Sequence, residues 1–292
     1  MAEPRHHLLI AGTGRAGTSA LVRYLTALGL DTHVSRRGQA AEWAPDAQAG
    51  LEDLPLTAVS PDLPYVVKAP WSYEFIEHTL RDPAIRIDAA ILPVRSLRAA
   101  AASRSIVQLQ ALHRTQPWMA DMPSTWEHFG SVPGGLVFSM SPTDQARVLA
   151  VGFHRLLEHL VVADVPVVLL AFPRFATDGD YLYRRLAPVL PVGVAAERAR
   201  EAHAATFQPG SVRVEEELEG EISADENPPE LMALDNAALR RELKRLRGEL
   251  AEQHRCAADL QHEVELLRGS RSWRMTRPLR RLVSAARRLR SP

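Results

Sequence analysis

The residues best suited to chemistry lie near the start of the chain, where a glycine-rich turn follows a short apolar run. Gly12, Gly14 and Gly17 stand between the apolar residues 8–11 and a segment from Ala20 that has helical spacing. Glycines let several backbone N–H groups converge on one anion, and a helix that begins there adds its partial positive charge. The turn therefore predicts a binding site for a phosphorylated, nucleotide-like ligand.

The spacing of these glycines fits two known kinds of nucleotide site. It matches the dinucleotide fingerprint, which also needs an acidic residue about 20 residues further on, at the end of a second strand. Asp31 stands at that distance, but the segment 32–37 after it is too polar for a buried strand. The turn also matches a P-loop in which Thr18 replaces the lysine that reaches the outer phosphates, which argues against an ordinary NTPase. The remaining alternative is a tight turn that binds no ligand.

A third kind of site matches more of the turn. The stretch Arg15-Ala16-Gly17-Thr18-Ser19-Ala20-Leu21 resembles the phosphosulfate-binding loop of sulfotransferases, especially the carbohydrate type. In that family the basic residue before the glycine contacts the 5′-phosphosulfate of the donor PAPS (3′-phosphoadenosine 5′-phosphosulfate), and the hydroxyl residues after it line the same phosphate. The resemblance implies a cofactor-binding loop made of Gly14, Arg15, Ala16, Gly17, Thr18 and Ser19.

A second element supports this resemblance. Sulfotransferases carry an arginine at a strand end and, eight residues later, a serine on the following helix, often with an arginine after it. Arg95, Ser103 and Arg104 reproduce this pattern after the apolar run 87–92, although Ser96-Leu97 replaces the usual Asp-Pro. The resemblance implies that Arg95 and Ser103 hold the 3′-phosphate of PAPS, and a guanidinium fork suits a phosphate. The alternative is an alanine-rich helix with solvated arginines.

Lys68 is a further candidate for the reaction. It ends the predicted strand 65–68, and ligands bind at the carboxyl ends of the strands in open α/β sheets. Its position resembles the Lys-x-Pro of several sulfotransferases, and in that reading Lys68 assists Arg15 in stabilising charge on the leaving phosphate. A solvated lysine at a strand end is the alternative.

Sulfuryl transfer also needs a base that takes a proton from the acceptor. Glu42 is the first candidate, because it lies on the polar, proline-broken segment 31–64, where some bacterial sulfotransferases place a glutamate. His33, Glu52 and Asp53 on the same segment remain open.

The elements that must position these residues alternate between strands and helices. Apolar runs predict strands at 8–11, 65–68, 87–92 and 165–172. Helical spacing predicts helices at 17–28, 71–80, 142–163, 181–186 and 195–205, with a further one after Arg95. This alternation predicts an α/β fold, and with the turn it favours a P-loop-type, three-layer arrangement in which helices flank a parallel sheet. The sulfotransferase-like domain is expected at 1–208.

The chain beyond this domain has a different pattern. An acidic, proline-containing linker is predicted at 209–230, and residues 231–268 carry a seam in alternating steps of four and three. The seam residues are Asn236, Leu239, Leu243, Leu246, Leu250, Gln253, Ala257, Leu260, Val264 and Leu267. The repeat predicts a long coiled-coil helix and a homodimer, with Asn236 favouring two strands in one register. A helix folded back on the domain is the alternative.

The tail, 269–292, is basic and carries Trp273 among spaced apolar residues. It resembles a tail found on bacterial glycosyltransferases and other enzymes of surface-polysaccharide synthesis. This implies peripheral contact with the anionic inner face of the membrane. A solvated tail and nonspecific nucleic-acid contact are the alternatives, and nothing else in the chain favours nucleic acid.

The composition limits the cellular compartment and the kinds of covalent and metal cross-link that we expect. The formal net charge is zero, and Cys256 is the only cysteine, so neither an intrachain disulfide nor a cysteine metal cluster is possible. The spacing of the histidines does not favour a metal site. The chain has no leader of signal-peptide type and no membrane-spanning apolar run, so a cytoplasmic protein is expected. Its abundant alanine, with arginine in place of almost all lysine, suggests a bacterial source.

Taken together, the resemblance covers about residues 8–207. It implies PAPS-dependent sulfuryl transfer to a hydroxyl or amine of a carbohydrate or other small cell-surface precursor, without a metal. Two alternatives remain from the residues alone. One is a kinase-like P-loop enzyme, and the other is a non-catalytic coiled-coil scaffold for polysaccharide-synthesis enzymes.

Overall fold

A computed structural model describes residues 3–12, 14–38, 43–44, 49–50, 52–53, 63–116, 141–191, 193–207 and 231–276. The chain divides by its contacts into two compact units, Met1–Leu239 and Arg240–Pro292. The boundary falls inside a long helix, and each unit is described by itself.

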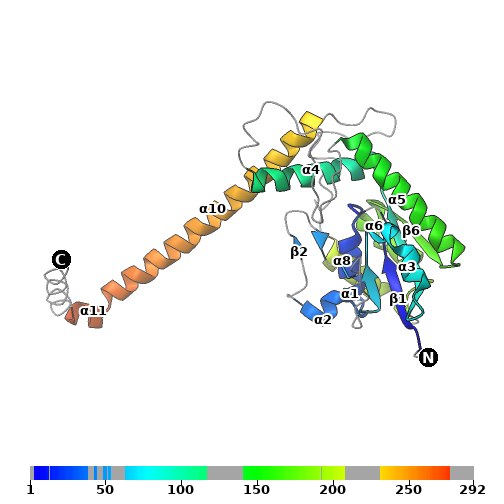
Figure 1. Cartoon of the computed structure of the whole chain (residues 1–292). Coiled ribbons are helices and arrows are strands. Elements are labelled where there is room, and N and C mark those ends of the chain that lie inside the picture. Colours follow the sequence, from blue (N-terminus) through cyan, green and yellow to red (C-terminus); the bar gives the residue numbers. More distant parts are fainter. Residues whose placement is uncertain are drawn as a thin grey trace. The chain divides into compact units, whose positions relative to one another are not determined.

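The first unit is built on a four-stranded sheet (Figure 1). Its strands are β1 (Arg5–Ile10), β4 (Val66–Lys68), β5 (Ile85–Val94) and β6 (Val167–Ala171), in the order β4-β1-β5-β6. Every neighbouring pair is parallel. The predicted α/β class with a parallel sheet is therefore confirmed. Two two-residue strands, β2 (Trp43–Ala44) and β3 (Ala49–Gly50), form a second, antiparallel sheet.

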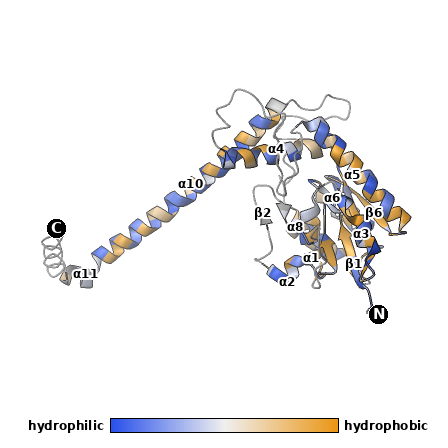
Figure 2. Ribbon diagram, in the orientation of Figure 1, coloured by the Kyte–Doolittle hydropathy of each residue, from blue (hydrophilic) through white to orange (hydrophobic). Residues whose placement is uncertain are grey.

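The strands form where the chain is continuously apolar, because both faces of the sheet are covered. Along β1, Leu8 and Ile10 enter one buried cluster, whereas Leu9 enters another. The first cluster is completed by the helices α1, α7 and α8, and the second by α3 and α5. Figure 2 shows these strands as an apolar layer within the unit.

The helices confirm most of the predicted elements. They are α1 (Thr18–Ala27), α2 (His33–Arg37), α3 (Ile76–Arg81), α4 (Leu97–Thr115), α5 (Pro142–Val162), α6 (Arg174–Thr177), α7 (Gly179–Leu186) and α8 (Ala196–Thr206). The predicted helix 71–80 is split, since a 3₁₀ turn, η2 (Ser72–Glu74), precedes α3. The polar segment after Asp31 forms α2, which begins with a capping box between Thr32 and Ser35. Its polarity argued against a second strand, and the structure confirms this. The only strand-like contact in the described segment 32–37 is one bridge between Thr32 and Val66.

The helix α10 (Leu231–Gly269) is continuous and is followed by α11 (Arg271–Met275). Its first turns belong to the first unit, where Leu234, Ala237 and Ala238 pack against the α4 residues Ala102, Ile106 and Leu109. Nε2 of His113 on α4 lies 2.7 Å from Oδ1 of Asp235, which adds a polar contact to this packing. From Arg240 onward the helix belongs to the second unit. No helix within the described ranges is both long and apolar enough to cross a membrane.

Gly17, the residue before α1, should not tolerate a side chain. Its φ of +79° lies in the left-handed region, and a Cβ there would lie 2.8 Å from Cζ of Phe175. We expect Gly17→Ala to lower the free energy of unfolding by about 2–4 kcal/mol in a denaturant titration, because backbone strain and steric overlap add. Gly193→Ala is the control, since its φ is also positive but nothing lies within 4 Å of the added Cβ. Its loss should be about 1–2 kcal/mol, and equal losses for the two variants would contradict the overlap.

Candidate functional site

The strand order creates a switch point between β1 and β5. From β1 the chain crosses to β4 on one side, and it then returns to β5 on the other side of β1. In open parallel sheets, ligands bind outside the carboxyl ends of the strands at such a point. The glycine-rich turn follows β1 and Arg95 follows β5, so the topology places both predicted motifs at this point of the sheet.

The residues of the two motifs are in contact. Nη1 of Arg95 donates a hydrogen bond to the backbone carbonyl of Arg15 at 2.9 Å. Nε of Arg15 in turn donates to Oγ of Ser103 on α4 at 3.1 Å. The Arg95 guanidinium also lies 5.0 Å from the ring centroid of Phe172, which follows β6. Arg15 is therefore hydrogen-bonded to two residues that lie 80 and 88 positions further along the sequence, and we call this arrangement the Arg95–Arg15–Ser103 chain.

The backbone of the turn has the conformation that its glycines suggest. Gly12, Gly14 and Gly17 all have positive φ, and so does Arg15, at +55°. A left-handed conformation costs a residue with a Cβ roughly 1–2 kcal/mol, and the hydrogen bond from Arg95 to the Arg15 carbonyl helps to hold it. In turns of this kind several N–H groups point to one side, where they can bind an anion.

The beginning of α1 is also suited to an anion. The N-cap residue is Gly17, which has no side chain to bond the first N–H groups, and no acidic residue lies in the first turn. The helix dipole would favour a negatively charged ligand at this end. Among the other predicted loop residues, Ala16 and Thr18 are buried, and Gly14 lies next to Pro70, since a Cβ on it would be 3.7 Å from Cβ of Pro70.

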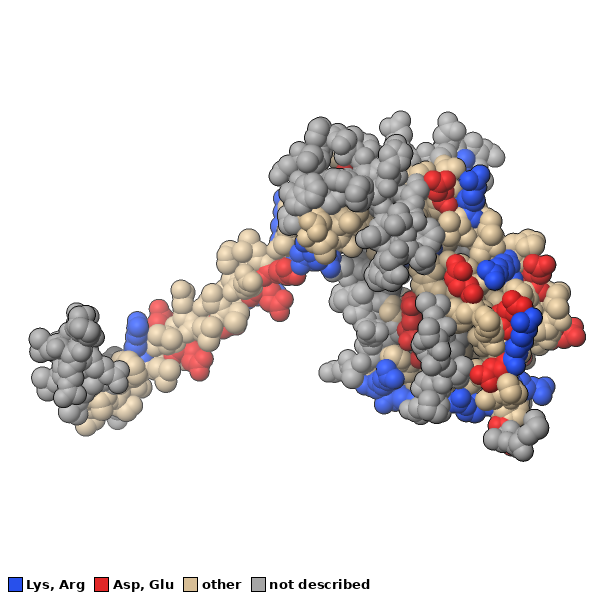
Figure 3. Space-filling view, in the orientation of Figure 1, with Lys and Arg blue, Asp and Glu red and all other residues tan. Residues whose placement is uncertain are grey.

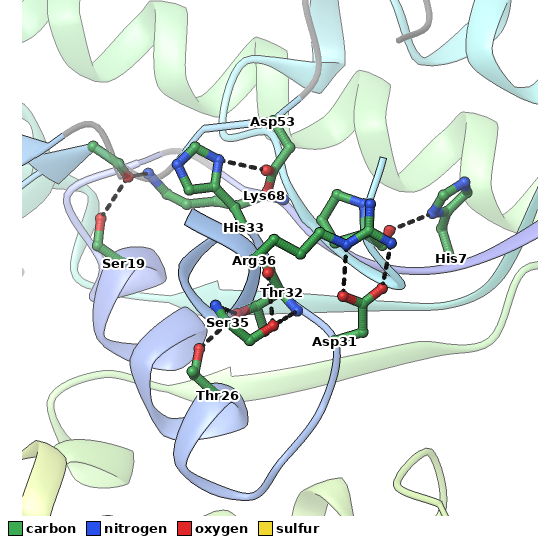
Figure 4. A network of polar contacts seen from close by, with 12 residues as sticks. His7, Ser19, Thr26, Asp31, Thr32, His33, Ser35, Arg36, Asp53 and Lys68 are labelled. Carbon is green, nitrogen blue, oxygen red and sulfur yellow. Dashed lines mark hydrogen bonds and ion pairs between the residues drawn. The ribbon is translucent and has the colours of Figure 1, made fainter. Parts of the chain in front are cut away.

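Lys68 is buried rather than solvated, with 1% of its side chain exposed. Its Nζ donates to the carbonyl of Gly50 and lies 3.4 Å from a carboxylate oxygen of Glu52. Oγ of Ser19, a predicted phosphate contact, donates to the same Gly50 carbonyl at 3.1 Å (Figure 4). Burial lowers the pKa of Lys68, and the Glu52 carboxylate opposes this shift. The end of β3 therefore brings a backbone oxygen to two groups that were expected to contact the ligand.

A buried histidine–aspartate pair lies beside Lys68 (Figure 4). Nδ1 of His33 is 2.9 Å from Oδ1 of Asp53, and the exposed fractions of the two side chains are 5% and 2%. The other carboxylate oxygen of Asp53 accepts from the backbone N–H of Lys68 at 2.9 Å. Burial raises the pKa of Asp53, while the Lys68 N–H and His33 oppose the rise. Nε2 of His33 is buried and has no hydrogen-bond partner among the described residues.

This pair is the arrangement that sequence reasoning missed. His33 and Asp53 were each named as open candidates for the base, but nothing in the sequence indicated that they touch. Glu42, the first candidate for the base, lies outside the described residues.

Arg104 does not join the Arg95–Arg15–Ser103 chain. Its guanidinium lies 4.6 Å from the ring centroid of Trp71, and burial lowers its pKa, against the opposing influence of Tyr73. The interpretation of Arg104 as a solvated helix arginine is therefore wrong. The structure places it against two aromatic residues that the sequence had assigned only to a helix.

Asp31, the acid required by the dinucleotide interpretation, is engaged elsewhere. Its two carboxylate oxygens accept from Nε and Nη2 of Arg36, each at 2.7 Å, and one of them also accepts from the backbone N–H of Tyr65. Arg36 lowers the pKa of this carboxylate. The structure thus gives Asp31 a role in joining α2 to the start of β4, and no second strand ends at it.

No group of three or more histidine, cysteine or acidic side chains that could hold a metal ion occurs in the parts of the chain described. Comparisons with protein-family models, curated proteins and solved structures found no match to this chain.

The depressed pKa of Lys68 predicts a pH dependence of stability. Between that pKa and the ordinary value of 10.5, the folded chain has released a proton that the unfolded chain still holds. Burial of the charged lysine is therefore a destabilisation that is complete below the folded pKa and fades as the pH rises toward 10.5. We expect the free energy of unfolding of the wild type to rise relative to that of Lys68→Met over this range.

Urea titrations of both proteins at several alkaline pH values measure this difference. The subtraction removes the contribution of the buried tyrosines, which titrate in both proteins. A constant difference across the range would show that Lys68 keeps its ordinary pKa in the folded chain.

Proposed function

We propose that the first unit is a nucleotide-binding protein of the P-loop type. Three observations support this class: the order strand, glycine turn and helix at β1 and α1, the glycine N-cap and acid-free first turn of α1, and the position of the turn at the switch point of the sheet. Each of them favours a phosphate at the same place.

Within that class we propose a PAPS-dependent sulfotransferase. The observation that carries this proposal is the Arg95–Arg15–Ser103 chain, because it brings a second arginine and a hydroxyl to the glycine turn. A nucleoside triphosphate has one phosphate chain, whereas PAPS carries anionic groups at both its 5′ and 3′ positions. Arg15 with the turn amides is suited to the 5′ end, and Arg95 with Ser103 to the 3′-phosphate.

Each residue of the candidate site has a distinct role in the proposed reaction. PAPS supplies the sulfuryl group, and the acceptor is a hydroxyl or amine of a carbohydrate or small cell-surface precursor. Arg15 and the turn amides stabilise the charge on the leaving phosphate. Lys68, whose Nζ shares the Gly50 carbonyl with Oγ of Ser19, adds to this effect in the proposed reaction. We assign the base to His33, because Asp53 can hold its Nδ1–H and leave the lone pair of Nε2 for the acceptor proton. Glu42 remains the alternative base.

A kinase-like P-loop enzyme is the second candidate. Lys68 favours it, because a buried lysine at the end of the neighbouring strand could replace the lysine missing at Thr18. The scaffold interpretation and the expected placement in the cytoplasm, with the basic tail on the inner face of the membrane, stay predictions. The tail from residue 277 onward is outside the described residues.

Ligand preference tests the proposal directly. We expect isothermal titration of the full chain to show binding of PAP, the product nucleotide, that is at least tenfold tighter than binding of ATP or NADP. Arg95→Ala should weaken PAP binding by roughly 10- to 100-fold, because a charge-assisted contact to phosphate contributes about 1.5–3 kcal/mol.

Arg114→Ala is the matched control, since Arg114 is an exposed arginine near the other end of α4. It should leave the affinity for PAP unchanged. A preference for ATP would favour the kinase-like alternative, and equal effects of the two substitutions would refute the assigned role of Arg95.

The base assignment has its own test. With transfer of labelled sulfate from PAPS to a panel of carbohydrate acceptors, His33→Gln should lower kcat by about 10²- to 10⁴-fold, while PAP binding stays within twofold. His78→Gln, a histidine substitution on α3, should change neither quantity. Loss of turnover in Glu42→Gln with normal turnover in His33→Gln would move the role of base to Glu42.

A further inference from the structure

We infer that residues 240–269 of α10 pair with the same residues of a second copy of this chain, as two parallel helices in register. This inference concerns the second unit and does not depend on the proposed function. It commits to one partner, a second copy, and to one orientation. Its basis is an exposed apolar seam together with the charges that border it.

The seam is not covered by any described part of the second unit. Leu243, Leu246, Leu250 and Leu260 have 48–57% of their surface exposed. Val264 and Leu267 continue the seam at 41% and 55% exposure. With Gln253 and Ala257 between Leu250 and Leu260, the seam follows steps of three and four along an unbroken helix. It forms one stripe, which is the pattern that a coiled-coil partner covers. Figure 2 shows apolar residues recurring among hydrophilic ones along this helix.

The charges beside the seam are ordered. With Leu243 and Leu250 at heptad position a, and Leu246 at position d, three of the four g positions carry Glu242, Glu249 and Glu263, and the fourth is Cys256. The e positions five residues after each of these glutamates carry Arg247, His254 and Arg268. Acidic and basic side chains both line the helix surface in Figure 3. One border of the seam is thus acidic and the other basic.

This order selects the orientation of the pair. In parallel helices in register, each g residue faces the e residue of the next heptad on the partner, so Glu242 faces Arg247, Glu249 faces His254 and Glu263 faces Arg268. In antiparallel helices, g faces g and e faces e, which would oppose glutamate to glutamate and arginine to arginine. Charges at these positions set the choice of partner and orientation in coiled coils.

The structure also shows which of these charges is best suited to a test. Glu242 and Glu249 already form ion pairs with Arg245 of the same helix. Glu263 and Arg268 are exposed and form no ion pair within the described chain. A change at this last pair therefore reports on the partner helix with little effect inside the single chain.

The first experiment measures orientation with the full chain. In a Cys256→Ser background, Leu260→Cys places one thiol at position d of the seam, and Arg255→Cys places one on the outer face. Under mild oxidation we expect a covalent dimer from the Leu260→Cys protein and little from the Arg255→Cys control. A dimer in analytical ultracentrifugation that does not cross-link through Leu260→Cys would overturn the parallel register. A monomer at every concentration would overturn the pairing itself. A helix that covers its seam within one chain would give this second result.

The second experiment measures the role of charge. Glu263→Arg should weaken self-association by about three- to tenfold, because it places arginine against arginine on both sides of the pair. The exchanged variant Glu263→Arg/Arg268→Glu restores opposite charges in a parallel pair and should recover the wild-type dissociation constant. In antiparallel helices paired over the whole segment, residue 263 would instead lie near Glu242 or Glu249 of the partner, so Glu263→Arg would relieve a repulsion and strengthen association. Strengthening by Glu263→Arg, or failure of recovery in the exchanged variant with an intact helix by circular dichroism, would count against the inference.

Discussion

The hydrogen bond from the Arg95 guanidinium to the carbonyl of Arg15 joins the ends of the two central strands. It can form only because β1 and β5 are parallel neighbours, so that the segments after them leave from the same edge of the sheet. The same bond supports a residue with a Cβ in the left-handed region, which would otherwise be unfavourable. The conformation of the turn, the strand order and the position of α4 therefore depend on one another.

Close packing around the turn reinforces this constraint. Gly17 lies against Phe172 and Phe175, which follow β6, so every strand of the sheet contributes a neighbour to the site. On the other side, the end of β3 brings the Gly50 carbonyl to both Ser19 and Lys68. The Gly50 carbonyl accepts from a buried ammonium and from a hydroxyl, and it therefore satisfies both of these donors. A phosphate arriving at the turn would offer stronger acceptors to both groups.

The helix α4 links the site to the start of α10. It carries Ser103 at the site, and farther along it carries the apolar side chains that receive Leu234, Ala237 and Ala238. Because one rigid helix makes both contacts, the beginning of α10 is part of the packed first unit. The seam residues from Leu243 onward remain exposed on the second unit, and this difference separates the part of α10 that stabilises the fold from the part that is suited to a partner.

The sequence by itself determined the elements whose signals are local. The glycine turn between strand and helix, the arginine after the strand at 85–94 and the heptad seam can each be recognised within a short window, because backbone conformation and helical spacing are short-range properties. Only the tertiary structure decided that Lys68 is buried against Gly50, that His33 pairs with Asp53 and that Arg104 lies on Trp71. The sequence of residues 31–64 has no periodicity from which contacts could be predicted, so the contacts of His33, Gly50 and Asp53 with one another and with Lys68 are visible only in the structure. The contact of Arg15 with Arg95 and Ser103 likewise depends on the strand order, because residue spacing does not determine which strands are neighbours.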